Sequence, residues 1–190
     1  MQATDYDVIV IGYGPVGETC ANLLGYYGIK SLIIDKETSV YPLPRAITWD
    51  KECERAISIC NFSEKLDLRI IRAVDHIDSN EKLIFRVQGT EKEKYKYFHS
   101  MSFMYQPEFD RVHRENALKY ETNTIKEGWE LINYREENDL ITCSIKDLNN
   151  NEIKNITTKY LIGSDGASSS VRKISKIELQ DYNCDQTWMV

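Results

Sequence analysis

A glycine-rich turn directly after an apolar, β-branched run constrains this chain more than any other feature of its sequence. Residues 7–11 (DVIVI) show no polar alternation, which is typical of a strand buried on both faces of a parallel sheet. The run leads into residues 12–17 (GYGPVG). Apolar side chains then recur at helical spacing up to a capping glycine, Gly28; they are Val16, Cys20, Leu23, Leu24 and Tyr27. A second apolar run, residues 31–35 (SLIID), follows and ends in a carboxylate. The sequence therefore predicts an N-terminal βαβ unit in an α/β fold with a parallel sheet.

The turn has the GxGxxG spacing of dinucleotide-binding sites, and it lies where such a site requires it, between a strand and a helix. Gly12 is expected to permit the tight turn, Gly14 to let a pyrophosphate approach the backbone, and Gly17 to let helix and strand pack closely. The helix N-terminus would supply N–H donors and partial positive charge to the phosphates. The candidate phosphate-binding residues are Gly12, Gly14, Pro15, Val16 and Gly17.

Asp35 stands eighteen residues beyond Gly17, at the end of the second predicted strand. A carboxylate at this place can accept hydrogen bonds from both hydroxyls of an adenosine ribose. The alternative is a Gly-rich turn with a purely structural role. The pattern by itself does not distinguish NAD(P) from FAD.

Composition excludes several other classes of protein. Lys and Arg total 24 against 30 Asp and Glu, so the net charge is −6 and no nucleic-acid partner is expected. The apolar runs fall far short of the ~20 residues that span a bilayer. Five cysteines without a CxxC pair indicate reduced thiols and a cytoplasmic protein, and three scattered histidines predict no metal site.

Beyond the βαβ unit, the pattern predicts a mixture of loops, helices and strands. Residues 40–47 carry two prolines and predict an ordered loop. One face of a helix is then predicted from Trp49, Cys53, Ala56, Ile57 and Cys60. Residues 74–105 predict a strand pair with a solvated, charged loop, EKEKYKYFHS.

The second half of the chain begins with a helix predicted over residues 108–121. Three strands are predicted after it as an antiparallel β-meander, at 129–136, 140–147 and 152–162. The segment from Gly163 to Lys173 predicts a turn that opens a short helix.

Several segments together resemble the FAD-dependent aromatic hydroxylases of the para-hydroxybenzoate hydroxylase superfamily, most closely the 3-(3-hydroxyphenyl)propionate hydroxylase type. These segments are residues 6–37, YPLPRAI at 41–47, YQPE at 105–108 and IGSDGASSSVRK at 162–173. The resemblance covers essentially the whole chain and implies a Rossmann-like FAD-binding fold. By this resemblance the segment with Asp165 and Gly166 is a second FAD fingerprint, whose aspartate holds the ribityl chain and which also serves the nicotinamide donor.

The same resemblance places Lys36 beside the adenosine, Arg45 near the flavin and its pyrophosphate, and Gln106 at the ribityl chain or the ring edge. The residues alone allow plainer roles. Asp165 could cap the helix that follows it. Arg45 could be a surface cation, and Gln106 a loop residue ahead of a helix.

The resemblance also implies a division into domains. Residues 1–73 and 106–175 are expected to form two parts of the FAD-binding domain, the second containing the meander. Residues 74–105 would be strands of a substrate domain, and residues 176–190 the beginning of its truncated remainder. Family members continue well past the position of Val190, so the chain is expected to be a fragment.

The activity implied is hydroxylation of a small phenolic compound with NAD(P)H and O2, and no catalytic residue is assigned to this part of the chain. Inactivity of the isolated fragment is expected, and self-association through exposed apolar surface is compatible with it. Two alternatives stay open. One is another FAD-dependent oxidoreductase of the same fold, and the other is a non-catalytic nucleotide-binding or interaction fragment.

Overall fold

The computed structural model describes residues 3–61, 65–88 and 101–186. They form two compact units, each described here by itself. The first consists of Met1–Tyr41 with His113–Val190, and the second of Pro42–Val112.

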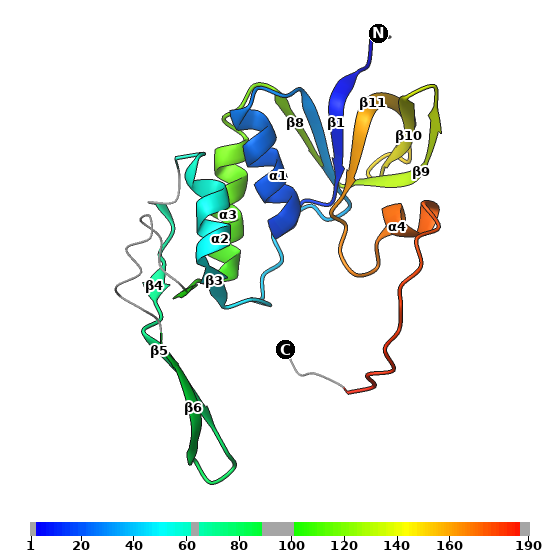
Figure 1. Ribbon diagram of the computed structural model, residues 1–190. Coiled ribbons are helices and arrows are strands. Elements are labelled where there is room, and N and C mark those ends of the chain that lie inside the picture. Colours follow the sequence, from blue (N-terminus) through cyan, green and yellow to red (C-terminus); the bar gives the residue numbers. More distant parts are fainter. Residues whose placement is uncertain (1–2, 62–64, 89–100, 187–190) are drawn as a thin grey trace. The chain divides into compact units, whose positions relative to one another are not determined.

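A six-stranded sheet forms the centre of the first unit (Figure 1). Its order is β8-β2-β1-β11-β10-β9, where β1 is Tyr6–Ile11, β2 Ser31–Asp35, β8 Asn123–Glu127, β9 Trp129–Glu137, β10 Leu140–Asp147 and β11 Ile153–Gly163. The strands β8, β2, β1 and β11 run parallel, whereas β11, β10 and β9 are antiparallel. The predicted βαβ unit and the predicted meander are therefore both confirmed, and β11 joins them in one sheet.

The side chains of β1 alternate between two apolar clusters, as expected for a strand buried on both faces. Ile9 and Ile11 lie in one cluster with residues of β2, β9 and β10, and Val171 and Ile174 pack against it. Val8 and Val10 lie in the other, together with Tyr13, Ala21 and Ala117. The first cluster is covered by the short helix α4, Ser170–Ile174, which confirms the helix predicted after Gly163.

Helix α1, Pro15–Tyr26, buries part of the face that its apolar residues predict, since Cys20 and Leu24 pack against the second cluster. Val16 and Tyr27 are 65% and 64% exposed. The buried residues are small or polar: Gly17, Glu18, Ala21, Asn22 and Gly25. Small residues permit close approach; a Cβ on Gly25 would lie 2.4 Å from the ring of Tyr120. The polar residues are stabilised by hydrogen bonds, as when the Asn22 amide donates to the His113 carbonyl at 3.0 Å.

Helix α3 covers Gln106–Ala117 rather than the predicted 108–121. It ends early because the chain must turn to bring β8 alongside β2, where the Ser31 amide donates to the Thr122 carbonyl at 2.9 Å. Strand β8 itself was not predicted, since its sequence, NTIKE, contains a single apolar residue. The strand forms because it pairs in parallel with β2, although its own sequence lacks an apolar pattern.

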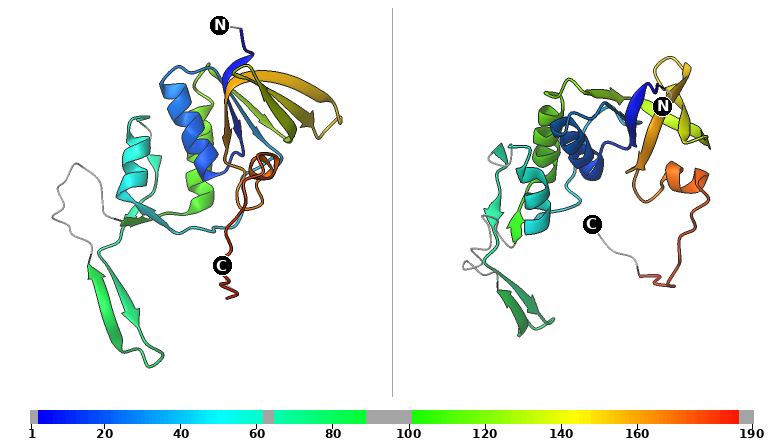
Figure 2. Two further views of the ribbon diagram at one scale, coloured as in Figure 1. Left: turned by 45° about the vertical axis from the view of Figure 1, so that its right-hand side comes forward. Right: turned by 45° about the horizontal axis from the view of Figure 1, so that its top comes forward.

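The second unit contains a small sheet and a separate hairpin. The sheet has the order β3-β7-β4, with β3 at Thr48–Asp50, β4 at Arg69–Ile70 and β7 at Met101–Phe103. The hairpin consists of β5, Ala73–Ile77, and β6, Leu83–Gln88, which confirms a strand pair in this region. Figure 2 shows it as a narrow ribbon, and within the described residues these two strands pair only with each other. The charged run at 91–100 lies outside the described residues.

The helix predicted from Trp49 to Cys60 is shorter than expected. Helix α2 covers Lys51–Ser58, so Trp49 is a strand residue and Cys60 follows the helix. The boundary is set by Asp50, whose carboxylate accepts a hydrogen bond from the Cys53 amide at 2.8 Å and caps the helix. Trp49 instead packs against Phe109, with ring centroids 4.3 Å apart.

A helix that crosses a lipid bilayer has to be both long and apolar. None in the described part of the chain combines the length and the apolar character needed to cross a membrane.

Candidate functional site

The glycine turn lies at the carboxyl ends of β1 and β2. Gly12 has φ +99°, a conformation that favours glycine, and its amide donates to the Ile34 carbonyl at 2.8 Å. A Cβ on Gly12 would lie only 2.4 Å from the Ser164 carbonyl oxygen. The predicted tight turn is confirmed, and it brings the glycine motif at residues 12–17 against the segment that contains Ser164 and Asp165.

Gly17 and Gly14 differ in what surrounds them. A Cβ on Gly17 would lie 1.9 Å from the Gly12 carbonyl oxygen, which confirms the predicted close packing of helix and strand. A Cβ on Gly14 would meet no atom within 4 Å. Gly14 is therefore not required by packing, and the space beside it leaves room for an approaching group.

The N-terminus of α1 fits an anionic group such as a diphosphate. Gly14 is the N-cap and makes no side-chain capping bond, and Pro15 at the first position has no N–H to satisfy. The amides of Val16 and Gly17 belong to the first turn, where N–H groups lack intrahelical acceptors. With the space at Gly14, these donors form a cradle at the positive end of the helix dipole.

Asp35 ends β2 and contacts the same turn. One carboxylate oxygen accepts a hydrogen bond from the Tyr13 amide at 2.5 Å, and the other accepts from the Glu37 amide at 2.8 Å. The side chain is thus oriented beside the glycine turn, as a ribose-binding carboxylate requires. Lys36 follows it and is exposed.

The segment after β11 is bonded directly to the glycine turn. The Ser164 hydroxyl bonds to the carbonyl oxygens of Ile11 and Gly12, each at 2.9 Å. Asp165 accepts hydrogen bonds from the amides of Ser170 and Val171, at 2.6 and 3.2 Å, at the start of α4. Asp165 therefore has the capping contacts that the residues alone allowed, and Gly166 follows in a left-handed conformation, with φ +75°.

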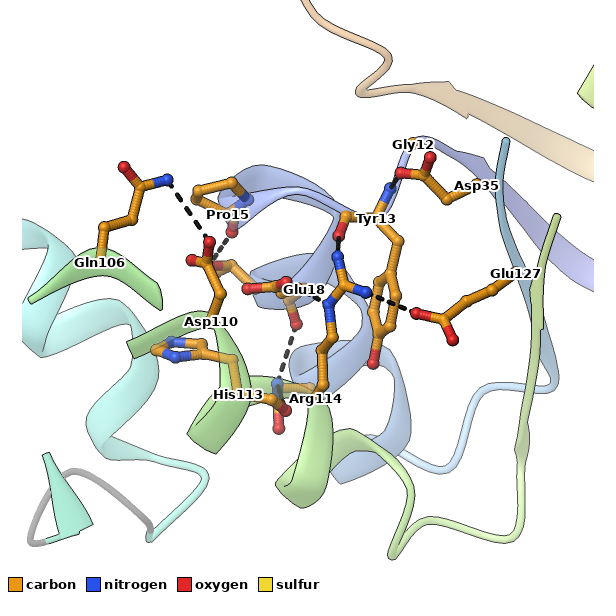
Figure 3. Close-up of polar contacts among 12 residues, drawn as sticks. Gly12, Tyr13, Pro15, Glu18, Asp35, Gln106, Asp110, His113, Arg114 and Glu127 are labelled. Atoms are coloured by element: carbon orange, nitrogen blue, oxygen red, sulfur yellow. Dashed lines mark hydrogen bonds and ion pairs between the residues drawn. The ribbon is translucent and has the colours of Figure 1, made fainter. Parts of the chain in front are cut away.

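Arg45 and Gln106 come together in the second unit. The buried Gln106 side chain accepts hydrogen bonds from the amides of Arg45 and Ala46, both at 2.9 Å. Its own amide group donates to Asp110 at 3.4 Å (Figure 3). Gln106 is the first residue of α3 rather than a loop residue, and it holds the backbone of the loop that carries the exposed Arg45.

Sequence reasoning missed a charged cluster beneath the glycine turn. Glu18 is fully buried and accepts a hydrogen bond from Arg114 at 2.7 Å, and Arg114 also bonds Glu127 at 2.5 Å (Figure 3). Burial alone would lower the pKa of Arg114, but the bond to Glu18 raises it above its ordinary value. The pKa of Tyr13, under the guanidinium, is raised mainly by burial. The sequence did contain one signal for this cluster. Glu18 is a charged residue in the first turn of the helix, and its neighbours Gly17 and Ala21 are small.

Comparisons with known proteins agree on one family. The sequence profile of the FAD binding domain family matches residues 5–189. The chain is 26% identical over 194 residues to a 3-(3-hydroxy-phenyl)propionate/3-hydroxycinnamic acid hydroxylase from Comamonas testosteroni, covering 98% of this chain and 31% of the relative. The chain thus spans about a third of the length of this curated relative.

Two solved structures share the fold. A p-nitrophenol 4-monooxygenase from Pseudomonas putida DLL-E4 has a TM-score of 0.81 and 21% identity, over 90% of this chain and 43% of that chain. The flavin-dependent monooxygenase PieE, solved with FAD and substrate, has a TM-score of 0.79 and 19% identity, over 94% of this chain and 33% of that chain. These similarities support the α/β fold with its parallel sheet and antiparallel strands.

Proposed function

Because the chain belongs to the FAD binding domain family, we propose that its glycine turn and Asp35 bind the ADP half of FAD. The observation that carries this proposal is the convergence of three elements in the first unit. The amides of Val16 and Gly17 and the space beside Gly14 belong to one turn at the carboxyl ends of β1 and β2, and the carboxylate of Asp35 contacts that turn. Crevices at these strand ends are where α/β sheets bind nucleotides.

Each group would have a distinct task. The first-turn amides would donate to the pyrophosphate, and Asp35 would accept from the ribose hydroxyls while keeping the Tyr13 amide in place. When bound, FAD supplies the redox chemistry, and the protein supplies binding and orientation. The segment after β11 supports the turn through Ser164.

We extend the proposal to the other residues singled out by the resemblance. Lys36 would flank the adenosine, Arg45 would lie near the pyrophosphate and flavin, and Gln106 near the ribityl chain or ring edge. The capping contacts of Asp165 hold that carboxylate in one orientation, in which it would also serve the ribityl chain with Gly166. The exposed position of Arg45, on a loop whose backbone the Gln106 side chain holds, supports the assignment of Arg45.

The activity proposed for the whole protein is hydroxylation of a small phenolic compound with NAD(P)H and O2. It is supported by the name of the Comamonas testosteroni relative, a hydroxylase of a hydroxyphenyl propionate. The exposed apolar side chains of the β5–β6 hairpin, among them Ile84 and Phe85, support its assignment to a substrate domain. A cytoplasmic location is part of the proposal, supported by five free cysteines.

Titration calorimetry with ADP and with FAD tests the binding site, and the absorbance spectrum of the purified protein tests for bound flavin. We expect ADP binding and a tighter association with FAD. An absence of heat and of protection against unfolding at millimolar ADP and FAD would contradict the proposal. A bound flavin without phenol hydroxylation by a protein of the relatives' length would favour another FAD-dependent oxidoreductase.

A further inference from the structure

Arg114 connects the glycine turn to two other elements of the first unit. Its guanidinium donates to the Tyr13 carbonyl at 2.6 Å, to Glu18 of α1 at 2.7 Å and to Glu127 of β8 at 2.5 Å (Figure 3). It also lies over the Tyr13 ring, 4.6 Å from the centroid. The Arg114 side chain is only 15% exposed, and that of Glu18 is 0% exposed.

These contacts fix the peptide groups on both sides of Tyr13. The Tyr13 amide donates to Asp35 at 2.5 Å, and its carbonyl accepts from Arg114. Tyr13 is the residue between the first two glycines, so both neighbouring peptide planes belong to the turn. Glycines on either side leave that backbone free to rotate, and the two bonds remove this freedom.

The direction of the Tyr13 carbonyl matters for an anion. A carbonyl oxygen that faced the cradle would repel a phosphate, whereas N–H groups that face it attract one. Arg114 holds this oxygen by a charge-assisted bond, and arginine suits the task because its planar fork can bond several oxygens at once. The same guanidinium forms ion pairs with the carboxylates of Glu18 and Glu127, which orient it.

We infer that Arg114 is a positioning residue of the phosphate-binding turn, which holds the Tyr13 carbonyl so that the turn presents its N–H groups to the diphosphate. This inference rests on the proposed dinucleotide site. It assigns Glu18 a supporting part, because Glu18 orients the guanidinium through a buried ion pair.

The test compares ligands with and without phosphates. ADP and adenosine are titrated against the parent chain, Arg114→Lys, Arg114→Gln and the double variant Glu18→Gln/Arg114→Gln, in which no buried carboxylate remains at position 18. Chemical denaturation of each variant measures its stability. Arg111→Gln is the matched control, since Arg111 forms an exposed ion pair with Glu108 on the same helix.

We expect the Arg114 variants to bind ADP at least about tenfold more weakly, the effect of losing one charge-assisted bond. Adenosine affinity should change by less than about twofold, because the ribose carboxylate is retained. The Arg111→Gln control should bind both ligands as the parent does. A merely structural role would weaken ADP and adenosine alike.

Two results separate the inference from its premise. If the parent chain does not bind ADP, the proposed dinucleotide site is wrong and this inference falls with it. If the parent binds ADP but the folded Arg114 variants keep its preference for ADP over adenosine, the inference alone is overturned. Failure of all three Arg114 variants to fold would show that the guanidinium serves stability, which also overturns the positioning role.

Discussion

Gly14 and Gly17 are identical residues three positions apart, yet substitution should affect them in opposite ways. At Gly14 an added methyl group meets no protein atom, so Gly14→Ala should change the free energy of unfolding by no more than about 0.5 kcal/mol. The methyl group would occupy the proposed pyrophosphate space, so ADP affinity should fall by about tenfold or more. Calorimetry and urea denaturation of the same variant measure both effects.

Gly17→Ala is the counterpart of that experiment. Its methyl group would overlap the Gly12 carbonyl oxygen, so this variant should lose on the order of 1–3 kcal/mol of stability or more. If Gly14→Ala were the unstable variant and Gly17→Ala the stable one, the assignment of packing and binding roles would be reversed.

Asp35 combines two hydrogen-bonding tasks in one carboxylate. Asp35→Ala should weaken ADP binding by on the order of 1–3 kcal/mol, because the ribose loses its acceptor and the Tyr13 amide loses its partner. Circular dichroism should show the fold retained. The neighbouring variant Glu37→Ala serves as control, and equal losses of ADP affinity in both would remove Asp35 from the site.

At the scale of single residues, the spacing of the glycines predicted their structural positions, whereas the charged residues did not reveal the cluster that they form. The positions of Gly12 and Gly17 follow from local sequence, since strand, turn and helix are consecutive. The cluster joins Glu18 to Arg114, 96 positions away, and to Glu127, so no local pattern contains it. Only the folded chain brings these charges to one place.

Among the elements, helix α4 begins at two acceptors: the Ser169 hydroxyl accepts from the Arg172 amide at 3.0 Å, and Asp165 accepts from the two preceding amides. Asp165→Ala removes the acceptor of the Ser170 and Val171 amides and should cost on the order of 0.5–2 kcal/mol of stability. If Asp165 also holds the ribityl chain, the variant should lose FAD affinity but keep ADP affinity, because ADP has no ribityl group. Calorimetry with both ligands decides the point, and an equal change for the two would leave Asp165 a helix cap only.

Elements with a clear periodic pattern of apolar residues were predicted well, whereas elements stabilised by residues far away in the sequence were not. The strands β9, β10 and β11 appeared at nearly their observed positions because turn residues separate them, and Asn138, Asp139 and Asn151 indeed have positive φ. The strand β8 was missed because its stability comes from pairing with β2. The buried face of α1 was predicted only in part, because Cys20 and Leu24 pack against the core but the fully buried Asn22 is stabilised by hydrogen bonds.

At the scale of the whole molecule, acid should reduce stability. The pKa values of several carboxyls lie below their ordinary values, that of Asp5 through hydrogen bonds from Thr157, Asp7 through Lys159 and Asp50 through the Cys53 amide. A carboxyl with a lowered pKa in the folded state stabilises it above the unfolded pKa of about 4, and this contribution is lost as pH falls. Denaturation between pH 3 and pH 7 should show stability falling below about pH 5. The variant Asp5→Asn should show a smaller decrease, and an unchanged profile would contradict the assignment.

The isolated 190-residue chain should not hydroxylate phenols, even with FAD and NAD(P)H present. It spans about a third of the Comamonas testosteroni relative, and the exposed apolar side chains of the β5–β6 hairpin lack a partner strand within the described residues. A flavin in such a chain would be open to water, which favours unproductive oxidation of NAD(P)H. Mass spectrometry after incubation with 3-(3-hydroxyphenyl)propionate measures the product, and stoichiometric hydroxylation would overturn this expectation.

The position of β1 in the sheet also has a consequence for synthesis. One of its neighbours, β2, ends at Asp35, but the other, β11, ends only at Gly163. At a translation rate of ~5–20 residues per second, one edge of this strand, which is apolar from Val8 to Ile11, stays unpaired for roughly 8–30 s until β11 has been synthesised. Chaperones that bind nascent chains are therefore expected to bind β1 early in synthesis. Slowing translation between β1 and β11 should increase aggregation of the nascent chain.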